Sequence, residues 1–322
     1  MDYRGLWRTI REIARENRKA SLLILVDMMW CVIRYGAGYI DYRIFDFARL
    51  SGAQRKTFVT QGKNENLIRR LNRKSDCRLM NDKIEFNKLF ESYIGREWID
   101  LRACSKEEFA SFLKGKSAII AKPVAEVSGK GVIIVETAQC QNPKELYCRL
   151  KKSGQVLVEQ MVVQHPDISR VYQDSVNTLR LFTIAMPDEV HVICRVMRFG
   201  VGGSVVDNFT AGGMFALVNE AGIIHTDAVN IKTEIFSAHP DTGEIFKGME
   251  IPFFAEAEAM AKEAARLVPG IRYVGWDIAI THTGPLFIEA NHNPGYVLMQ
   301  SKVYLLENDY GLLPMIKKIL KG

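Results

Sequence analysis

Short apolar segments that alternate with turn-forming residues begin near residue 117, and they constrain the fold more strongly than any other feature of the sequence. Five of them have the length and apolar character of strands: residues 118–121, 132–135, 156–158, 179–185 and 190–196. A helical pattern over 255–268 ends at Pro269-Gly270, and two further strands are expected at 273–280 and 286–290, around a turn centred on Thr283. Strands that follow one another with few intervening helices predict an α+β body with a mostly antiparallel sheet.

The first part of the chain has a different character. Helical periodicity over residues 1–78 predicts a helical N-terminal region, followed by the α+β body at 79–322. Residues 1–75 contain 16 Lys and Arg against 7 Asp and Glu, a net charge of +9, whereas the rest of the chain carries −3. We interpret the basic helices either as a solvated face or as a surface for phospholipid head groups or another anionic partner. Asn81 is expected to cap the next helix.

The sequence favours a cytoplasmic protein, with peripheral contact at the inner membrane face as the alternative that the basic helices leave open. Its start lacks the basic and apolar pattern of a secretory signal. The most apolar early run, residues 21–33, has 13 residues and contains Asp27, so it is too short to span a bilayer. The six cysteines form no Cys-x-x-Cys pair, which indicates reduced thiols and argues against zinc. No basic motif interleaved with aromatic residues predicts nucleic-acid binding.

The C-terminal hairpin carries three polar residues in an otherwise apolar setting. A turn centred on Thr283 places Asp277 opposite Glu289, and Asn291 shares the face of Glu289 because side chains alternate along a strand. Opposed carboxylates repel unless a cation lies between them, and three oxygen ligands suit Mg²⁺. The alternative is that one carboxylate forms a salt bridge and the other is solvated.

Three other stretches suggest a site for nucleotide phosphates. Lys122-Pro123 ends a strand, and the loop Ser128-Gly129-Lys130-Gly131 leads into the next one, either as a phosphate-binding loop or as an ordinary hairpin turn. The strand with Glu159-Gln160-Met161 could offer backbone groups to a purine, or be a plain edge strand. Arg180 lies in an apolar strand, where it forms either a structural ion pair or a clamp on a phosphoryl group.

Taken in their order along the chain, these motifs resemble those of the ATP-grasp superfamily, and most closely those of its sugar-transfer-associated branch. The resemblance covers roughly residues 80–300 and, more loosely, the helical region before them. The closer match to this branch rests on three runs: Gln164-His165-Pro166, Ser175-Val176-Asn177-Thr178-Leu179-Arg180 and Glu289-Ala290-Asn291-His292-Asn293-Pro294-Gly295. It implies an ATP-grasp fold, in which two α+β lobes grip ATP, preceded here by the helical region. Residues 79–160 would include the smaller lobe.

The resemblance also implies roles for individual residues. Contacts to ATP would come from Lys83, Lys122, Ser128, Gly129, Lys130, Gly131, Glu159, Gln160 and Met161, with His165 or Asp167 at the ribose. Metal ligands would be Asp277, Glu289 and Asn291, and the catalytic and substrate-side residues would be Arg180, Arg198 and Asn293. Arg198, Asn208 and Gly212-Gly213 resemble a stretch of ribosomal-protein glutamate ligases. Here Gly200, Gly202 and Gly203 lengthen that loop, so the acceptor side departs from the pattern.

The implied activity is an ATP-dependent ligase that joins a small-molecule carboxylate to an amine or to a sugar-linked acceptor. ATP and two Mg²⁺ ions, with Mn²⁺ as an alternative, would be its cofactors, and it would act through an acyl phosphate in polysaccharide or glycoconjugate modification. A hydroxyl acceptor would give an ester instead of an amide. The alternatives are an ATP-dependent kinase with the same nucleotide site and a non-catalytic nucleotide-binding scaffold.

Overall fold

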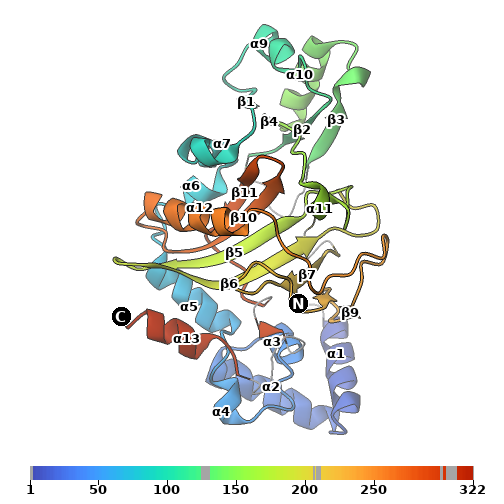
Figure 1. Cartoon of the computed structure of the whole chain (residues 1–322). Helices are drawn as coiled ribbons and strands as arrows, with labels where there is room; N and C mark the ends of the chain where they lie inside the picture. Colours follow the sequence, from blue (N-terminus) through green and yellow to red (C-terminus); the bar gives the residue numbers. More distant parts are fainter. Residues whose placement is uncertain are drawn as a thin grey trace.

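A seven-stranded sheet forms the centre of the molecule, which we describe from a computed structural model (Figure 1). The structure describes residues 3–124, 131–205, 207, 212–297, 300–301 and 310–321. The strand order is β11-β10-β5-β6-β7-β8-β9, and every neighbouring pair is antiparallel. The bounds are β5 Thr178–Ala185, β6 Val190–Phe199, β7 Met214–Leu217, β8 Ala228–Val229, β9 Ile235–Phe236, β10 Tyr273–Thr281 and β11 Gly284–Asn291. The expected antiparallel α+β body is therefore confirmed.

Helices cover both faces of this sheet because successive side chains of its strands point to opposite sides. On one face, the alanine-rich α12 (Phe254–Leu267) packs Ala257 and Ala261 against a core that includes Leu181 and Trp276. On the other face, α5 (Gln61–Leu71) and α13 (Leu313–Ile319) pack against a core that includes Phe182. The sheet is thus buried on both faces, and polar side chains within it need partners.

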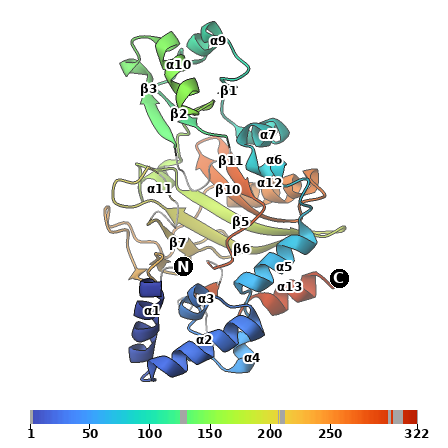
Figure 2. The ribbon, with the colours of Figure 1, turned by 180° about the vertical axis from the view of Figure 1, so that it is seen from behind.

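A smaller, four-stranded antiparallel sheet has the order β1-β4-β2-β3. Its strands are β1 Trp98–Asp100, β2 Ala118–Lys122, β3 Ile133–Glu136 and β4 Leu157–Gln160, and its helices are α9 Lys106–Phe112 and α10 Pro143–Ser153, with the 3₁₀ turn η1 Thr137–Gln139. Three short helices lead into it: α6 Arg78–Asn81, α7 Lys83–Leu89 and α8 Glu91–Ile94. After β4 the chain returns through α11 (Pro166–Ser169) to β5. Figures 1 and 2 place this sheet at the end of the molecule opposite the N-terminal helices.

The helical N-terminal region consists of several short helices. They are α1 Tyr3–Glu16, α2 Ser21–Tyr35, α3 Tyr39–Ile44 and α4 Gly52–Arg55, followed by α5. The chain turns at Arg18 (φ 51°), and Gly36 ends α2 in the left-handed conformation (φ 63°) that glycine adopts without strain. The Asp41 carboxylate accepts a hydrogen bond from the Tyr296 hydroxyl (2.6 Å), which ties the region to the segment after β11.

The expected cap at Asn81 is wrong. Asn81 is the last residue of α6, and Asp82 caps α7 by accepting hydrogen bonds from the backbone N–H groups of Ile84 and Glu85. Aspartate is as good a cap as asparagine, so the pair Asn81-Asp82 is ambiguous in the sequence. Among the described residues, no helix has both the length and the apolar character needed to cross a membrane.

Candidate active site between the two sheets

The two sheets meet at a cavity of about 150 Å³ with polar and charged walls. The smaller sheet contributes Lys122 and Glu159, and the larger sheet contributes Thr178, Arg198, Asp277 and Glu289. Lys83, the first residue of α7, also lines the cavity. Seven of the residues predicted for ATP, metal or catalysis therefore line one space, although they come from distant parts of the sequence: Lys83, Lys122, Glu159, Gln160, Arg198, Asp277 and Glu289.

The structure places Asp277 directly opposite Glu289, as the sequence predicted, but the position of the turn differs from the expected one. The hairpin turns between Thr281 and Gly284, which by itself would pair Asp277 with Ile288. A β-bulge after Asp277 shifts the register by one residue and restores the pairing with Glu289. Bulges commonly re-aim side chains beside active sites.

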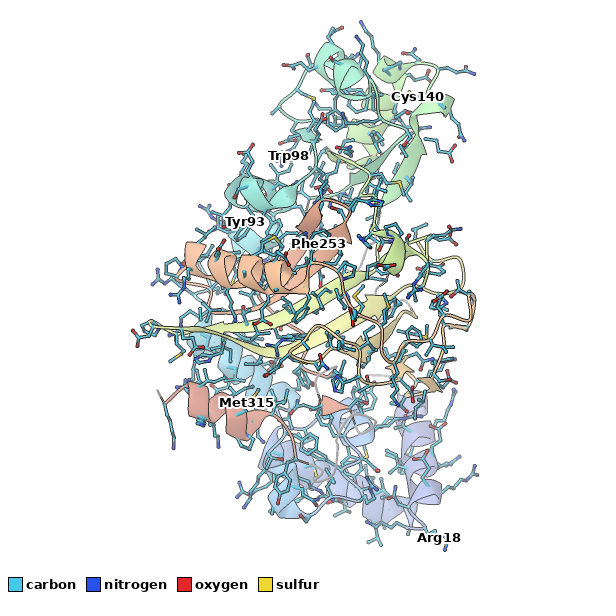
Figure 3. The ribbon with its side chains drawn as sticks, in the orientation of Figure 1. Arg18, Tyr93, Trp98, Cys140, Phe253 and Met315 are labelled. Carbon is cyan, nitrogen blue, oxygen red and sulfur yellow. The ribbon has the colours of Figure 1, made fainter. Side chains whose placement is uncertain are left out.

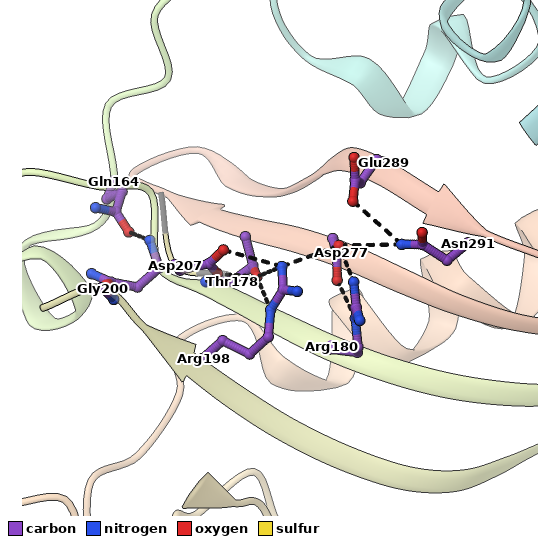
Figure 4. A network of polar contacts seen from close by, with 10 residues as sticks. Gln164, Thr178, Arg180, Arg198, Gly200, Asp207, Asp277, Glu289 and Asn291 are labelled. Carbon is purple, nitrogen blue, oxygen red and sulfur yellow. Dashed lines mark hydrogen bonds and ion pairs between the residues drawn. The ribbon is translucent and has the colours of Figure 1, made fainter. Parts of the chain in front are cut away.

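Two arginines from neighbouring strands hold Asp277, which is fully buried (Figure 4). Arg180 lies opposite Asp277 in the β5–β10 ladder and donates from Nε (2.5 Å) and from its terminal nitrogen. Arg198 approaches Asp277 at 3.1 Å from β6. The arrangement is the structural ion pair that the sequence left as one of two alternatives for Arg180.

The environment shifts the pKa values of Asp277 and Glu289 in opposite directions. Burial disfavours the charged form of Asp277, but the positive charges of Arg180 and Arg198 outweigh it and keep the pKa of Asp277 below its usual range. For Glu289, burial and the negative charge of Asp277 both raise the pKa above its usual range. The amide of Asn291 donates to Glu289 (3.3 Å) and reaches Asp277 at 3.5 Å. Two facing carboxylates and an amide that can rotate to present its oxygen fit a hard divalent cation such as Mg²⁺.

Histidine and cysteine do not take part in this set. Within the described ranges, no group of three or more His, Cys, Asp or Glu side chains is arranged to hold a metal ion. The candidate cation site consequently rests on two carboxylates and the Asn291 amide. A cation with two protein carboxylates keeps further positions for water or for substrate phosphates, which is the usual environment of Mg²⁺ beside a nucleotide.

A third carboxylate, the buried Asp207, extends the network. Thr178 donates to it from its hydroxyl and from its backbone N–H, the latter over 3.0 Å, and Arg198 lies 3.2 Å away. Burial and the charge of Asp277 raise the pKa of Asp207 despite the attraction of Arg198. Arg198 also donates to the Thr178 hydroxyl (2.7 Å), so this arginine bridges Asp207, Thr178 and Asp277.

Across the cavity, Glu159 is the centre of a second buried cluster. Lys122 contacts one carboxylate oxygen at 2.5 Å, and Arg96 (2.9 Å) and Asn87 (2.7 Å) donate to the other. Burial would favour the protonated acid, but Arg96 and Lys122 lower the pKa of Glu159 to about 2. Glu159 thus fixes the position of Lys122 at the cavity wall.

This pKa has a measurable consequence for the free energy of unfolding. Because the carboxyl titrates at about 2 when folded and near 4.5 when unfolded, its stabilising contribution is present above pH 4.5 and is lost as the pH falls towards 2. The contribution is about 3 kcal/mol. We expect Glu159→Gln to lower the unfolding free energy by at least about that amount at pH 7, and the difference from the unchanged protein to shrink below pH 4.5.

Urea unfolding of both proteins between pH 7 and pH 3 measures this difference. A Glu107→Gln variant is the matched control, since Glu107 pairs with Lys144 at the exposed surface and its removal should cost little at any pH. A Glu159→Gln deficit that stayed constant down to pH 3 would contradict the ion-pair assignment.

The segment after β4 leads out of the cavity into a neighbouring groove of about 340 Å³. Gln160 lines both spaces, and Met161 lines the groove. His165 is placed differently: it accepts a hydrogen bond from the Asp167 backbone N–H at the start of α11, and neither residue lines the cavity or the groove. The expected adenine and ribose contacts remain predictions.

Other predicted residues lie around or outside this region. Asn293 is exposed, two residues beyond Asn291 at the end of β11. Gly131 packs closely against Pro123: a Cβ added to Gly131 would lie 3.2 Å from the proline ring. Ser128, Gly129 and Lys130 lie outside the described residues, as does Asn208. The strands β2 and β3 that flank the Ser128–Gly131 loop form an antiparallel pair.

Sequence reasoning missed Arg96, Asn87 and Asp207. Arg96 and Asn87 come from segments with no recognisable motif and meet Glu159 across 63 and 72 residues of chain. Asp207 follows the glycine-rich stretch after β6, so the lengthening of that loop was the signal that could have drawn attention to it. Gln164 and Asn177 were noted only as motif residues. They serve the framework: Gln164 exchanges hydrogen bonds with the 175–177 backbone, and Asn177 accepts one from Gly200 N–H.

Comparison with known proteins gives one match by family. Residues 62–321 match the family described as sugar-transfer associated ATP-grasp. No curated protein matches the chain by sequence. The motif order that first suggested this family is therefore confirmed over most of the chain.

Several solved structures resemble the chain at low sequence identity. ATP-grasp ligase PsnB complexed with minimal precursor is 14% identical, with a TM-score of 0.45 over 78% of this chain and 63% of that one. D-alanyl-alanine synthetase A from Vibrio cholerae is 13% identical, with a TM-score of 0.44 over 76% and 64%. L-amino acid ligase from Bacillus licheniformis is 14% identical, with a TM-score of 0.38 over 68% and 42%. The chain thus spans less than two thirds of the length of these proteins.

The family match covers both sheets, the cavity between them and every described residue of the two carboxylate clusters. The chain belongs to the sugar-transfer associated ATP-grasp family, and its two-sheet α+β architecture is an ATP-grasp fold.

Proposed function

We propose that the chain is an ATP-dependent ligase that activates a carboxylate as an acyl phosphate and joins it to an amine. The observation that carries the proposal is the facing pair Asp277 and Glu289, held in one cavity with Lys83 and Lys122. Carboxylates that hold a divalent cation, together with lysines on the opposite wall, are what a triphosphate needs to be bound and neutralised. Family membership supports the same reading.

The cation would be Mg²⁺ held by Asp277, Glu289 and Asn291, and its chemistry there would be to neutralise the triphosphate and polarise the γ-phosphoryl group. Lys122, fixed by Glu159, is suited to contact the phosphates from the smaller sheet. Residues 160–163 line the adjoining groove, which makes this segment the candidate for the adenine contact. Gln160, Met161 and the ribose residues His165 or Asp167 stay part of this proposal. So do the phosphate-binding loop Ser128-Gly129-Lys130-Gly131 and Asn293 on the substrate side.

In the proposed reaction, one oxygen of the substrate carboxylate attacks the γ-phosphorus of ATP and ADP leaves. The acceptor amine then attacks the carbonyl carbon, releases inorganic phosphate and loses a proton, so that an amide remains. Of the two predicted arginines, Arg198 lines the cavity and Arg180 does not, which makes Arg198 the better candidate for stabilising the developing negative charge. Arg180 is directed at Asp277 and would position that carboxylate.

The substrate class is the finer part of the proposal. The description of the family as sugar-transfer associated supports an acceptor or an acid from polysaccharide or glycoconjugate modification. A hydroxyl in place of the amine would give an ester, and Mn²⁺ could replace Mg²⁺ because both accept oxygen ligands.

A screen for ADP release tests the proposed activity. The chain is incubated with ATP and Mg²⁺ and with pairs of carboxylic acids and amines, including amino acids and amino or carboxylated sugars, and any product is weighed by mass spectrometry. A ligase gives a product whose mass is the sum of acid and amine less one water. A product heavier by one phosphoryl group would instead indicate a kinase, and ATP that binds but is never hydrolysed would indicate a nucleotide-binding scaffold.

A further inference from the structure

The helix α2 presents a second apolar face that the protein interior does not cover. Its inner face packs Ile24, Met28 and Cys31 into the core of the N-terminal region. Six apolar side chains lie on the opposite face, exposed by between 54% (Trp30) and 78% (Ile33): Leu22, Leu23, Val26, Met29, Trp30 and Ile33. Their spacing of three, four and seven residues places them along one continuous stripe, which we call the outer face of α2.

Isolated exposed apolar residues are normal on a protein surface, but a continuous stripe of this size marks a site of interaction. The stripe is not needed for the packing of α2, because the inner face of this helix already holds it against the core of the N-terminal region. Asp27 is the acidic residue of α2, and Arg55 neutralises it through hydrogen bonds of 2.7 and 2.8 Å. The outer face therefore presents apolar surface without an unpaired negative charge from its own helix.

Positive charges border this stripe. Arg34 is exposed and lies one helical turn beyond Trp30, at the edge of the outer face. Arg18 is exposed in the turn that immediately precedes α2. The neighbouring helix α1 exposes Arg8, Arg11 and Arg15, whose spacing places them on one side of that helix. Figure 3 shows Arg18 at the end of the molecule opposite Cys140 of the smaller sheet.

An apolar stripe on a helix that lies flat, bordered by basic and aromatic side chains, is the pattern of a helix that inserts into the surface of an anionic bilayer. Trp30, Trp7 and Tyr39 are all about half exposed and are the amphipathic aromatic types that favour the membrane interface. A second copy of this chain fits less well, since a two-fold contact would bring two basic N-terminal regions, each of net charge +9, face to face.

We propose that α2 docks this protein on an anionic phospholipid surface, with its outer face among the acyl chains and the bordering arginines at the head groups. Residues 1–61, which include α2, precede the segment matched by the family. The proposal concerns that N-terminal part and does not depend on the proposed ligase activity.

Co-sedimentation with vesicles tests the proposal on the full chain. We expect binding to vesicles of phosphatidylcholine and phosphatidylglycerol, little binding to phosphatidylcholine alone, and weaker binding at high salt. The triple variant Leu22→Gln, Val26→Gln, Ile33→Gln should lose more than about tenfold in vesicle affinity, because each change removes apolar surface from the inserted face. The charge variant Arg18→Gln, Arg34→Gln should bind the anionic vesicles more weakly, because each arginine near the surface adds to the attraction, and should bind phosphatidylcholine alone as the unchanged protein does.

The matched control is Ile235→Gln, Ile245→Gln, which removes two equally exposed apolar residues outside the N-terminal helices. It should bind vesicles as the unchanged protein does. Because all substituted positions are exposed, thermal unfolding of each variant should match that of the unchanged protein. Equal vesicle binding by the triple variant would overturn the proposal. The proposal would also be overturned, in favour of a second copy, by a dimer that forms with rising concentration and is abolished in the triple variant, if neither the unchanged protein nor this variant binds vesicles.

Discussion

Replacing Glu289 with glutamine is expected to lower ATP turnover by about two to three orders of magnitude while leaving the free energy of unfolding unchanged or higher. Activity falls because one of the two carboxylates proposed to hold Mg²⁺ loses its charge. Stability does not fall because the half-buried Glu289 faces the charged Asp277, and glutamine removes that repulsion. The change is nearly isosteric, so the cavity keeps its shape.

Two measurements check this expectation together. Steady-state ADP release gives the turnover, and urea unfolding with and without Mg²⁺·ATP gives the stability and its dependence on ligand. Glu220→Gln, an exposed acid in a turn, is the control and should change neither quantity. Turnover close to that of the unchanged protein would remove Glu289 from the metal site, whatever happened to stability.

Replacing Asp277 with asparagine is expected to abolish turnover as well, but at a large cost in stability. Asp277 is fully buried and balances Arg180 and Arg198, so its loss leaves two arginines without their shared carboxylate. Removing one partner of a buried ion pair typically costs about 3–5 kcal/mol. Two acids that face each other across one hairpin should therefore respond to the same kind of substitution with different stabilities.

A double-mutant cycle separates the contribution of the ion pair. Asp277→Asn combined with Arg180→Gln should destabilise the protein by less than the sum of the two single changes, because the second substitution removes the buried charge that the first one stranded. Urea unfolding of the four proteins gives the coupling energy. Additive effects would show that Arg180 and Asp277 do not form the bidentate contact seen in the structure.

The hairpin shows that the face of a strand on which a residue lies can be predicted from the sequence, whereas the register between two strands cannot. The two-residue periodicity of strands was enough to bring Glu289 and Asn291 to one side, and the apolar setting made an opposed acid conspicuous. The hairpin turns between Thr281 and Gly284, and this turn alone would pair Asp277 with Ile288. The β-bulge after Asp277 shifts the register by one residue, so Asp277 still pairs with Glu289. A bulge depends on packing across the whole sheet, and no local signal in the sequence encodes it.

Arg180 and Glu159 illustrate the limit set by tertiary contacts. Whether Arg180 meets Asp277 or a phosphoryl group depends on the register between β5 and β10, which are separated by almost a hundred residues. Glu159 is engaged by Lys122 and also by Arg96 and Asn87, which come from segments without a motif. The residue types were visible in the sequence, but their partners were fixed only when distant elements packed together.

Helix α2 shows the same limit for surfaces. The sequence of residues 21–35 is apolar on nearly all sides, a pattern that usually belongs to a buried helix. The basic charge of the region suggested a surface role, but periodicity alone could not tell which side is buried. The structure resolves the two faces because Ile24 and Met28 meet the aromatic cluster of the N-terminal region, whereas Leu22 and Ile33 point away from it.

Transfer of oxygen from the substrate acid to phosphate tests the central claim most directly. Once the screen identifies an acid that stimulates ADP release, the acid is prepared with ¹⁸O in its carboxylate and the released phosphate is analysed by mass spectrometry. An acyl-phosphate ligase predicts one ¹⁸O atom in each phosphate, because the amine breaks the bond between the carbonyl carbon and the bridging oxygen. Phosphate without ¹⁸O, formed alongside an amide product, would contradict the proposed mechanism.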